Sequence, residues 1–486
     1  MHVIVIGGGV SGLGTALALA RRGHSVTVVE RDHTPMPTSA DEAFDWDRRG
    51  APQVRHSHAF LARLHRLLLH DYPDVLASLI AEGATEIRFG DDLPAEIADF
   101  EREPGDDDLV MLACRRTTFE WVVRRAALAE GHVEFRTGVA AIGLTTAGFQ
   151  DSGARRPIVS GVRLSDGTEL SGDLVVAAAG RRSVVPAWLA DIGAAEVPEE
   201  VEDTGIVYFS RFYKLREGCD YPASSGLIGG DLGYLKYGVF VGDNRTFSVT
   251  LAVSTEDNEL RRALGAPAAF EIAARHLTVT APWLDGRAEP ITPTVHVMAG
   301  LLNRWRDYVI DGEPVAVGIV PVGDAILCTN PLYGRGCTTA FWGAHLLADA
   351  IDASPDDVEE IARSYDAAMR TEIRPWYKAS VEQDSEARRV AAALLAGVDP
   401  DADSDDPRTF VRMLLRDGLA PALRRDQVVL RSFMRTLNML APPDAMANDP
   451  DVGARILAVW EDRGNREPEP ELGPKHRVDF VELLPA

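Results

Sequence analysis

The residues with the clearest capacity for chemistry are three glycines near the start of the chain, spaced as Gly7-x-Gly9-x-x-Gly12. They follow an apolar run, residues 2–6, and precede an Ala/Leu-rich stretch that Gly23 ends. In a strand–turn–helix unit, such glycines allow a tight turn, close approach of main chain to a pyrophosphate, and close helix–strand packing. The spacing and its context therefore predict a dinucleotide-binding turn.

An acidic residue completes this first predicted site. Residues 25–29 form a second β-branched run, which predicts a strand, and Glu30 stands at its end with Arg31 beside it. A carboxylate at this point of a βαβ unit accepts hydrogen bonds from ribose hydroxyls, and the helix N-terminus favours phosphate. We expect the three glycines, Glu30 and Arg31 to bind an ADP group. This motif alone does not distinguish NAD from FAD, because both contain ADP.

A second glycine-rich segment lies far along the chain. A buried-strand pattern ends at Gly323-Asp324, and Pro331-Leu-Tyr-Gly334-Arg-Gly336 then precedes an Ala/Leu-rich helix. Asp324 at a strand end can bind a sugar-chain hydroxyl, and glycines let main chain contact a flat ring. A helix that begins near Gly336 would direct its positive end at a ring carbonyl, where reduced flavin carries negative charge. A purely structural strand–turn–helix is the alternative.

Together these segments resemble the flavoprotein monooxygenases of the para-hydroxybenzoate hydroxylase fold, over about residues 1–350. The resemblance implies that FAD is the cofactor, with the glycine motif and Glu30 on its ADP half. It implies that Gly323-Asp324 meets the ribityl chain. It also implies that Arg116, the first residue of Arg-Thr-Thr-Phe-Glu, reaches the same chain.

Two further segments refine this resemblance. The run Gly50-Ala-Pro-Gln-Val-Arg-His-Ser-His58 resembles a subgroup of actinobacterial tailoring enzymes, which includes polyene epoxidases. The family's Asp-Gly motif, in contrast, appears here as Ala179-Gly180, so an aspartate linked to flavin and nicotinamide binding is missing. We therefore expect the electrons to come either from NAD(P)H or from a separate flavin reductase.

The order of these patterns predicts an α/β chain, α+β overall, and 486 residues are too many for one ordinary domain. We expect a Rossmann-like FAD-binding domain of the para-hydroxybenzoate hydroxylase type, interleaved with an antiparallel β-sheet substrate domain and followed by a C-terminal helical region. The predicted boundaries are 1–84, 109–185 and 300–355 for the FAD-binding domain, 85–108 and 186–299 for the β-rich domain, and 356–486 for the helical region.

The composition limits the classes of partner that the protein is expected to bind. Acidic residues outnumber Lys and Arg by 74 to 50, and a formal charge of −24 argues against binding to nucleic acid. The four cysteines form no CxxC pair, and we expect no disulfide framework. We find no signal peptide and no apolar run of the roughly 18 residues that span a bilayer. These features predict a soluble, cytoplasmic protein without a transmembrane segment.

The sequence predicts no metal site. No Cys or carboxylate completes a recognisable ligand set with the histidines of the first 70 residues, which include His56 and His58. The acidic run at 399–407 fails the EF-hand pattern, because Ser404 stands where the glycine belongs and Phe410 where the glutamate belongs. We expect that run to be a solvated linker.

The resemblance implies an FAD-dependent monooxygenase of secondary metabolism. It would epoxidise or hydroxylate an apolar or aromatic small molecule with O₂, through a flavin hydroperoxide. No side-chain acid or base is essential to that scheme, so we predict no catalytic residue. One alternative is a flavin-dependent reductase or dehydrogenase of an isoprenoid-like substrate, and another is a non-catalytic flavin-binding module. A halogenase is disfavoured, because the Trp-x-Trp-x-Ile-Pro signature does not occur.

Overall fold

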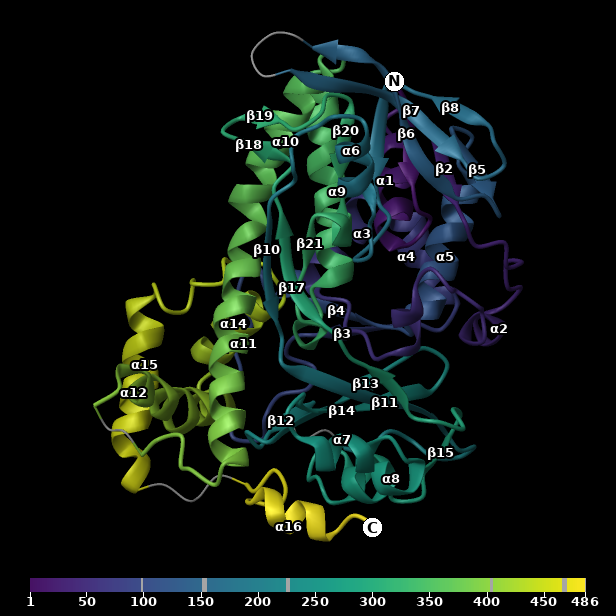
Figure 1. Ribbon diagram of the computed structural model, residues 1–486. Coiled ribbons are helices and arrows are strands. Elements are labelled where there is room, and N and C mark those ends of the chain that lie inside the picture. Colours follow the sequence, from purple (N-terminus) through teal and green to yellow (C-terminus); the bar gives the residue numbers. More distant parts are fainter. Residues whose placement is uncertain (98, 151–154, 224–227, 403–404, 466–469, 486) are drawn as a thin grey trace.

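The computed structural model describes residues 1–97, 99–150, 155–223, 228–402, 405–465 and 470–485. Figure 1 shows a half with a parallel sheet at the top, a second sheet below it, and long helices along one side. Six sheets or ribbons are present within the described residues. The parallel sheet and the larger antiparallel sheet form the framework for the site.

The parallel sheet has the strand order β20-β9-β1-β2-β5. Its strands are β1 (His2–Ile6), β2 (Ser25–Glu30), β5 (Val133–Thr137), β9 (Leu174–Ala177) and β20 (Ile319–Pro321). The apolar run of β1 is continuous because both of its faces are buried. Val3 and Val5 pack toward the helices, whereas Ile4 and Ile6 pack toward an antiparallel meander. That meander consists of β6 (Ala141–Gln150), β7 (Arg156–Leu164) and β8 (Glu169–Ser171).

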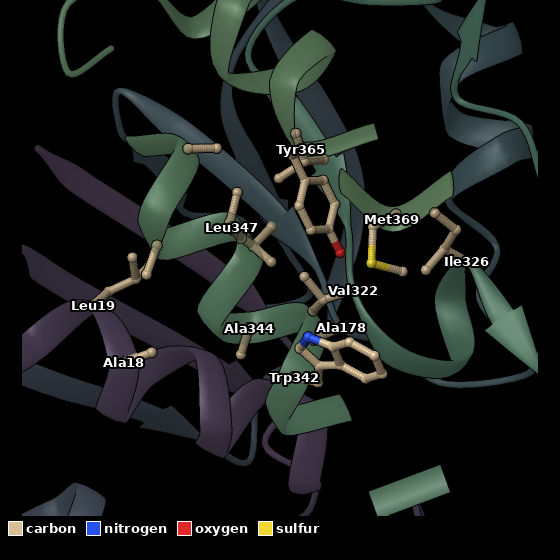
Figure 2. Packing of buried hydrophobic residues seen from close by; sticks show 14 of the residues in the cluster. Ala18, Leu19, Ala178, Val322, Ile326, Trp342, Ala344, Leu347, Tyr365 and Met369 are labelled. Atoms are coloured by element: carbon tan, nitrogen blue, oxygen red, sulfur yellow. The ribbon is translucent and has the colours of Figure 1, made fainter. Parts of the chain in front are cut away.

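Three helices pack closely around β1 on the helical face of the sheet. They are α1 (Val10–Ala20), α5 (Arg116–Ala129) and α9 (Gly336–Ala353). A Cβ on Gly14 of α1 would lie 3.3 Å from the Phe341 ring of α9, so glycine allows this close crossing. Figure 2 shows the core between these helices and α10 (Val358–Glu372), where Leu347, Tyr365 and Met369 meet.

The larger antiparallel sheet has the order β12-β13-β14-β11-β15, and β16 also pairs with β11. Its strands are β11 (Ile206–Leu215), β12 (Gly229–Asp231), β13 (Leu235–Val241), β14 (Thr246–Ser254), β15 (Ala288–Pro290) and β16 (His296–Met298). The side chains of β11 alternate. Val207 and Phe209 face a core shared with α7 (Asn258–Leu264) and α8 (Pro267–Arg275), and Ser210 faces the other side.

Shorter strands connect these layers. β3 (Thr85–Arg88) pairs with β4 (Val110–Ala113), and β18 (Val309–Ile310) pairs with β19 (Glu313–Pro314). β17 (Leu302–Arg306) lies between β10 (Glu199–Asp203) and β21 (Leu327–Cys328). The remaining helices of the first half are α2 (Ala40–Phe44), α3 (Ala62–Asp71), α4 (Pro73–Ala81) and α6 (Val185–Asp191).

The chain after α10 is helical. Its helices are α11 (Arg374–Leu395), α12 (Pro407–Leu414), α13 (Ala420–Arg425), α14 (Gln427–Leu437), α15 (Pro450–Glu461) and α16 (Arg477–Glu482), with a π-helical turn at Leu415–Leu419. This part is not separate from the rest. α11 contacts β14 and β17, and Phe480 of α16 is fully buried in the core beneath the antiparallel sheet (Figure 1).

The α/β fold class predicted from the sequence is confirmed. The leucine-rich stretch before Ala81 forms two helices rather than one, because Pro73 cannot continue a helix and begins a new one. The domain boundaries given above stay a prediction. Among the described residues, no helix combines the length and the apolar character needed to cross a membrane.

Candidate cofactor and active site

The first glycine turn is built so that main chain surrounds an open space. Gly7 has φ +109°, and a Cβ there would lie 2.6 Å from the Ala178 carbonyl oxygen. A Cβ on Gly12 would overlap the Gly7 carbonyl oxygen. A Cβ on Gly9 would meet no atom within 4 Å. The turn is therefore tightly packed at Gly7 and Gly12, and it leaves open space at Gly9.

The N-terminus of α1 faces this open side without a cap. Gly9 is its N-cap residue, and no side chain accepts a hydrogen bond there and no acidic residue lies in the first turn. Helices α7, α10, α12, α14 and α15 are instead capped by aspartates. The first N–H groups of α1 have no partner in the helix, and such a terminus favours phosphate.

Glu30 is fixed beside the same turn. Its Oε2 accepts a hydrogen bond from the Gly8 N–H at 2.9 Å, and its Oε1 accepts one from the Asp32 N–H at 2.9 Å. Arg48 donates to the Gly8 carbonyl oxygen at 3.0 Å and lies 3.4 Å from Glu30 Oε2. Arg48 was not predicted from the sequence. Arg31, which was predicted, has an exposed side chain next to Gly50.

A buried charge network extends from Arg48 into α5. Arg48 Nε donates to Glu120 Oε1 at 2.7 Å, and Arg116 Nη1 lies 2.7 Å from Glu120 Oε2. Burial opposes ionisation of Glu120, but the guanidinium groups of Arg116 and Arg48 outweigh it and lower the pKa of this carboxyl. Arg124, one turn further on, has buried Nε and Nη1 atoms without hydrogen-bond partners among the described residues. These donors suit an anionic ligand.

The structure brings the second glycine motif to the first. Gly323, at the end of the β20 segment, has φ +58°, and a Cβ there would overlap Ser11 Oγ in the first turn of α1. The adjacent Asp324 carboxylate has no hydrogen-bond partner within the described part of the chain. Burial raises its pKa, whereas the charges of Arg181 and Arg116 act to lower it. Asp324 is therefore an acceptor near the same helix terminus as Gly9.

The predicted ring-facing loop continues from there. Pro331 is exposed and begins a 3₁₀ turn, Pro331–Tyr333, after which Gly334 has φ +66°. A Cβ on Gly334 would lie 3.1 Å from Ala59 Cβ, which places the loop against the histidine-containing segment 50–58. α9 begins at Gly336 without a side-chain cap or an acid in its first turn, and a Cβ on Gly336 would meet nothing within 4 Å.

Two histidines lie deep beside this loop. His58 Nδ1 lies 2.9 Å from the His56 carbonyl oxygen, and His56 Nδ1 lies 3.2 Å from Ser210 Oγ. Burial, together with nearby positive charge, lowers the pKa of His56 to about 4 and that of His58 to about 3. Both imidazoles are neutral at pH 7. If His58 Nδ1 donates to the carbonyl, its Nε2 is a hydrogen-bond acceptor.

The antiparallel sheet presents hydroxyl groups to the same region. Ser57 Oγ lies 2.7 Å from Ser248 Oγ and 2.6 Å from Thr250 Oγ1, and Thr250 Oγ1 lies 2.9 Å from Ser210 Oγ. This hydroxyl cluster, Ser57, Ser210, Ser248 and Thr250, was not predicted from the sequence. Its members come from three separate segments, so no local spacing identifies it.

A cavity of about 240 Å³ lies between the antiparallel sheet, α11 and the ring-facing loop. Ile206, Leu235 and Ala252 contribute apolar surface from the sheet, and Ala387 and Ala391 contribute it from α11. The cavity is also lined by polar residues, which include Tyr234, Asn330, Tyr333 and Asp384. This mixture of apolar and polar surface suits a small organic molecule.

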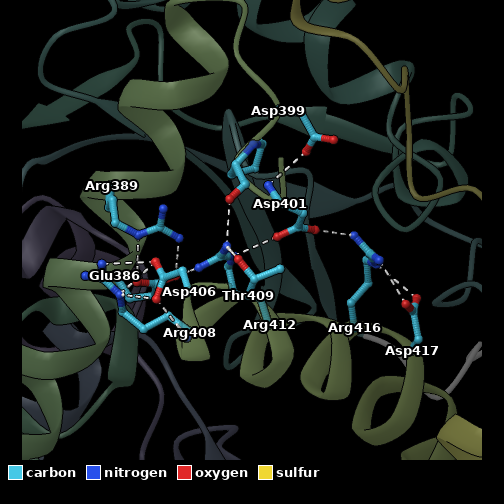
Figure 3. A network of polar contacts seen from close by, with 11 residues as sticks. Glu386, Arg389, Asp399, Asp401, Asp406, Arg408, Thr409, Arg412, Arg416 and Asp417 are labelled. Atoms are coloured by element: carbon cyan, nitrogen blue, oxygen red, sulfur yellow. Dashed lines mark hydrogen bonds and ion pairs between the residues drawn. The ribbon is translucent and has the colours of Figure 1, made fainter. Parts of the chain in front are cut away.

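The acidic run that begins at Asp399 is paired with arginines. Figure 3 shows Asp401 between Arg412 and Arg416, with N···O distances of 2.8 and 2.7 Å. Asp406 accepts a hydrogen bond from the Arg408 N–H and caps α12. Residues 403–404 lie outside the described residues. In the part of the chain that the structure describes, no group of three or more His, Cys, Asp or Glu could hold a metal ion.

The glycine-turn unit is similar to that of FAD-dependent oxidoreductases. Residues 2–89, which contain the glycine turn and Glu30, match the family model described as FAD dependent oxidoreductase. Protein Rv3254 of Mycobacterium tuberculosis is 27% identical over 497 residues, which cover 96% of each chain. The 2-heptyl-3-hydroxy-4(1H)-quinolone synthase of Mycobacteroides abscessus is 27% identical over 390 residues, 76% of this chain and 87% of that one.

A solved structure shows the same fold. PqsL of Pseudomonas aeruginosa, described as a probable FAD-dependent monooxygenase, superposes with a TM-score of 0.57 at 18% identity, over 81% of this chain and 99% of its own. PqsL has also been solved in complex with 2-aminobenzoylacetate. The sequence-based resemblance to flavoprotein monooxygenases of the para-hydroxybenzoate hydroxylase fold is thereby confirmed at the level of fold.

Proposed function

We propose that the protein is a monooxygenase that binds FAD between the two glycine motifs. The proposal is supported by the open space at Gly9 and Gly336, which are the uncapped starts of α1 and α9. It is also supported by the buried Arg124 Nε and Nη1 atoms, which have no hydrogen-bond partner among the described residues, and by the buried Asp324 carboxylate of the second glycine motif. The predicted cofactor-binding residues are Gly7, Gly9, Gly12, Glu30, Arg31, Arg116, Gly323, Asp324, Pro331, Gly334 and Gly336, and Arg48 and Arg124 are added from the geometry.

Each part of the site has a distinct task. The N–H groups of α1 near Gly9 bind phosphate oxygens, and Asp324 accepts hydrogen bonds from the ribityl hydroxyls. The N-terminus of α9 at Gly336 stabilises negative charge at the ring carbonyls. Bound FAD supplies two-electron transfer and, when reduced, activation of dioxygen.

The substrate is an apolar or aromatic small molecule, and the observation that carries this is the cavity beside the ring-facing loop. The cavity adjoins Asn330 and Tyr333, so a molecule in it lies next to the predicted ring site. Its lining combines this apolar surface with three charged residues, Lys236, Asp384 and Arg388, which could bind polar groups of the substrate. A water-poor surrounding protects oxygen transfer from side reactions. One similar protein is named 2-heptyl-3-hydroxy-4(1H)-quinolone synthase, and PqsL has been solved in complex with 2-aminobenzoylacetate.

Oxygen incorporation tests this function. The protein reconstituted with FAD and supplied with a flavin reductase and NADH is incubated under ¹⁸O₂ with 2-aminobenzoylacetate, and in parallel with 2-heptyl-4(1H)-quinolone. A product that is heavier by one ¹⁸O atom supports a monooxygenase. Anaerobic reduction of an alkene, with no oxygen transfer to any compound tested, would instead favour the reductase alternative.

A separate flavin reductase is our proposed source of electrons. Ala179 follows β9 and carries no carboxylate, and the nearest charged side chain along the turn is the guanidinium of Arg181. Anaerobic bleaching of the flavin by NADH or NADPH, with and without a flavin reductase, tests this point. Fast bleaching by either nicotinamide alone would show that the enzyme reduces its own flavin.

A further inference from the structure

The C-terminal region contributes a buried carboxylate to the ring-facing loop. Asp384 of α11 is 2% exposed. Its Oδ1 accepts hydrogen bonds from Asn330 Nδ2 and from the Tyr333 hydroxyl, both at 2.8 Å, and its Oδ2 accepts one from Asn303 Nδ2 at 2.6 Å. Asn303 Oδ1 in turn accepts the Asn330 N–H at 2.8 Å. Two residues of the loop and one residue of β17 therefore converge on one carboxylate.

Asn330 extends the network to the antiparallel sheet. Its Oδ1 accepts hydrogen bonds from the Tyr208 hydroxyl and, at 3.0 Å, from the Leu332 N–H. Asn330 is 1% exposed and immediately precedes the turn that leads to Gly334 and Gly336. The conformation of the loop is thus specified by side chains from β11, β17 and α11, in addition to its own main chain.

Asp384 differs from the other buried aspartates in its partners. Among the described residues, those aspartates each pair with an arginine: Asp106 with Arg431, Asp243 with Arg115, Asp257 with Arg477, and Asp366 with Arg370. The hydrogen bonds to Asp384 come only from amides and a phenol. Burial raises its pKa, and these donors and the charge of Arg388 act to lower it. A buried carboxylate that no arginine hydrogen-bonds is costly, so its donors must be held precisely.

We propose that Asp384 is a positioning residue that fixes the Asn330–Gly336 loop against the flavin ring. This inference rests on the proposed FAD site. Asp384, Asn330 and Tyr333 also line the cavity beside α11, so the same carboxylate positions both the wall of the cavity and the loop at the ring. The C-terminal region therefore acts on the ring site through α11.

The test compares Asp384→Asn with Asp366→Asn, each prepared without flavin and titrated with FAD. Asp366 is the matched control, because it is a buried aspartate on the neighbouring helix α10 that bonds to Arg370 at 2.6 Å. We expect Asp384→Asn to raise the Kd for FAD about tenfold, equivalent to one lost charge-assisted hydrogen bond, and to change the visible flavin spectrum. Asp366→Asn should lower the Tm and leave the flavin spectrum unchanged.

Two further variants keep the inference testable if Asp384→Asn folds poorly. Tyr333→Phe removes one donor and should raise the Kd for FAD less, about threefold. The double variant Asp384→Asn with Asn330→Asp exchanges the acid and the amide, and it should restore part of the wild-type spectrum. Equal FAD affinity and equal spectra in Asp384→Asn, Tyr333→Phe and wild type would overturn the positioning role. Failure of the wild-type protein to bind FAD would instead overturn the proposed function itself.

Discussion

The two ends of the proposed cofactor site are constructed differently. At the glycine-turn end, main-chain N–H groups of α1 and a network of charged side chains, Arg48, Glu120 and Arg116, surround the space in front of Gly9. At the loop end, amides and a phenol donate to one shared carboxylate, Asp384, and the histidines are neutral. One end suits a phosphate, and the other suits an uncharged ring.

This difference explains how each end achieves rigidity. Charged groups at the first end are buried together with opposite charges, so the cost of burial is offset by pairing. The second end relies on hydrogen bonds between distant segments, and the buried guanidinium of its own loop, Arg335, donates to Ser380 Oγ and to the Trp376 carbonyl oxygen of α11. The predictions that follow are ordered from the largest expected effect to the smallest, and each one distinguishes the two ends.

Removing the shared anion of the charged end should have the largest effect. Glu120→Gln leaves Arg48 and Arg116 buried without their carboxylate, and we expect the free energy of unfolding to fall by about 3–5 kcal/mol. Urea denaturation of the purified protein measures this change. Glu134→Gln is the control, because its pair with Arg136 is 60% and 52% exposed, and it should change stability by less than about 0.5 kcal/mol. A loss below about 1 kcal/mol in Glu120→Gln would show that pairing does not stabilise this end.

Acid should act through the loop end. The pKa of His56 is about 4 in the folded protein, against 6.5 for an ordinary histidine, so the unfolded chain takes up the proton first as pH falls below 6.5. The free energy of unfolding is therefore highest above pH 6.5 and declines until about pH 4, by about 3 kcal/mol for this group at 1.36 kcal/mol per pKa unit. Denaturation at several pH values should show that the free energy of unfolding depends less on pH in His56→Asn than in the wild type. Identical pH profiles would show that His56 is not buried as described.

Glycine substitutions should separate folding from binding at the first end. Gly12→Ala forces a Cβ onto the Gly7 carbonyl oxygen, and we expect a loss of about 1–3 kcal/mol in stability together with weaker FAD binding. Gly9→Ala places its Cβ in open space, so it should weaken FAD binding while it leaves stability almost unchanged. Calorimetry without flavin, combined with FAD titration, checks both. Equal stability losses in the two variants would contradict the open space at Gly9.

The smallest effect on stability is expected in the cavity. Ala387→Trp should fill part of the space beside α11 and weaken binding of 2-heptyl-4(1H)-quinolone about tenfold, equivalent to about 1.4 kcal/mol, with little change in FAD affinity. Ala392→Trp on the exposed face of α11 is the matched control. The measurement is the flavin absorbance change on titration with the quinolone. If both variants bind the quinolone equally, the cavity is not the substrate site.

The fold could be predicted from the sequence because its signals are local. The β1–Gly7–α1–β2 unit needs only apolar runs and glycines in order, and the structure places these elements as predicted. The boundary between α3 and α4 could also be predicted from the sequence, because Pro73 begins the second helix. The pairing of Asp401 with Arg412 and Arg416 was not expected, because an arginine's partner cannot be identified from one amphipathic helix.

The site could be predicted only in part. The glycines and Asp324 carry recognisable spacings, and the structure brings Gly323 against Ser11, although their contact with FAD stays a prediction. Arg48 lies in an irregular loop, and Asp384 lies four residues after Ser380 on the buried face of α11, where a charged residue gives no sign of its partners. Their roles depend on which segments meet in three dimensions, and no local pattern encodes that meeting.

The position of Phe480 has a consequence for synthesis on the ribosome. The core beneath the antiparallel sheet includes this side chain from α16, although the strands of that sheet end at residue 298. At about 5–20 residues per second, the sheet emerges on the order of ten seconds or more before the residue that completes its core. During that interval its apolar underside is exposed to other nascent chains and to chaperones. A variant truncated before α16 should therefore lose more of its soluble yield in cells than it loses of its flavin binding once purified.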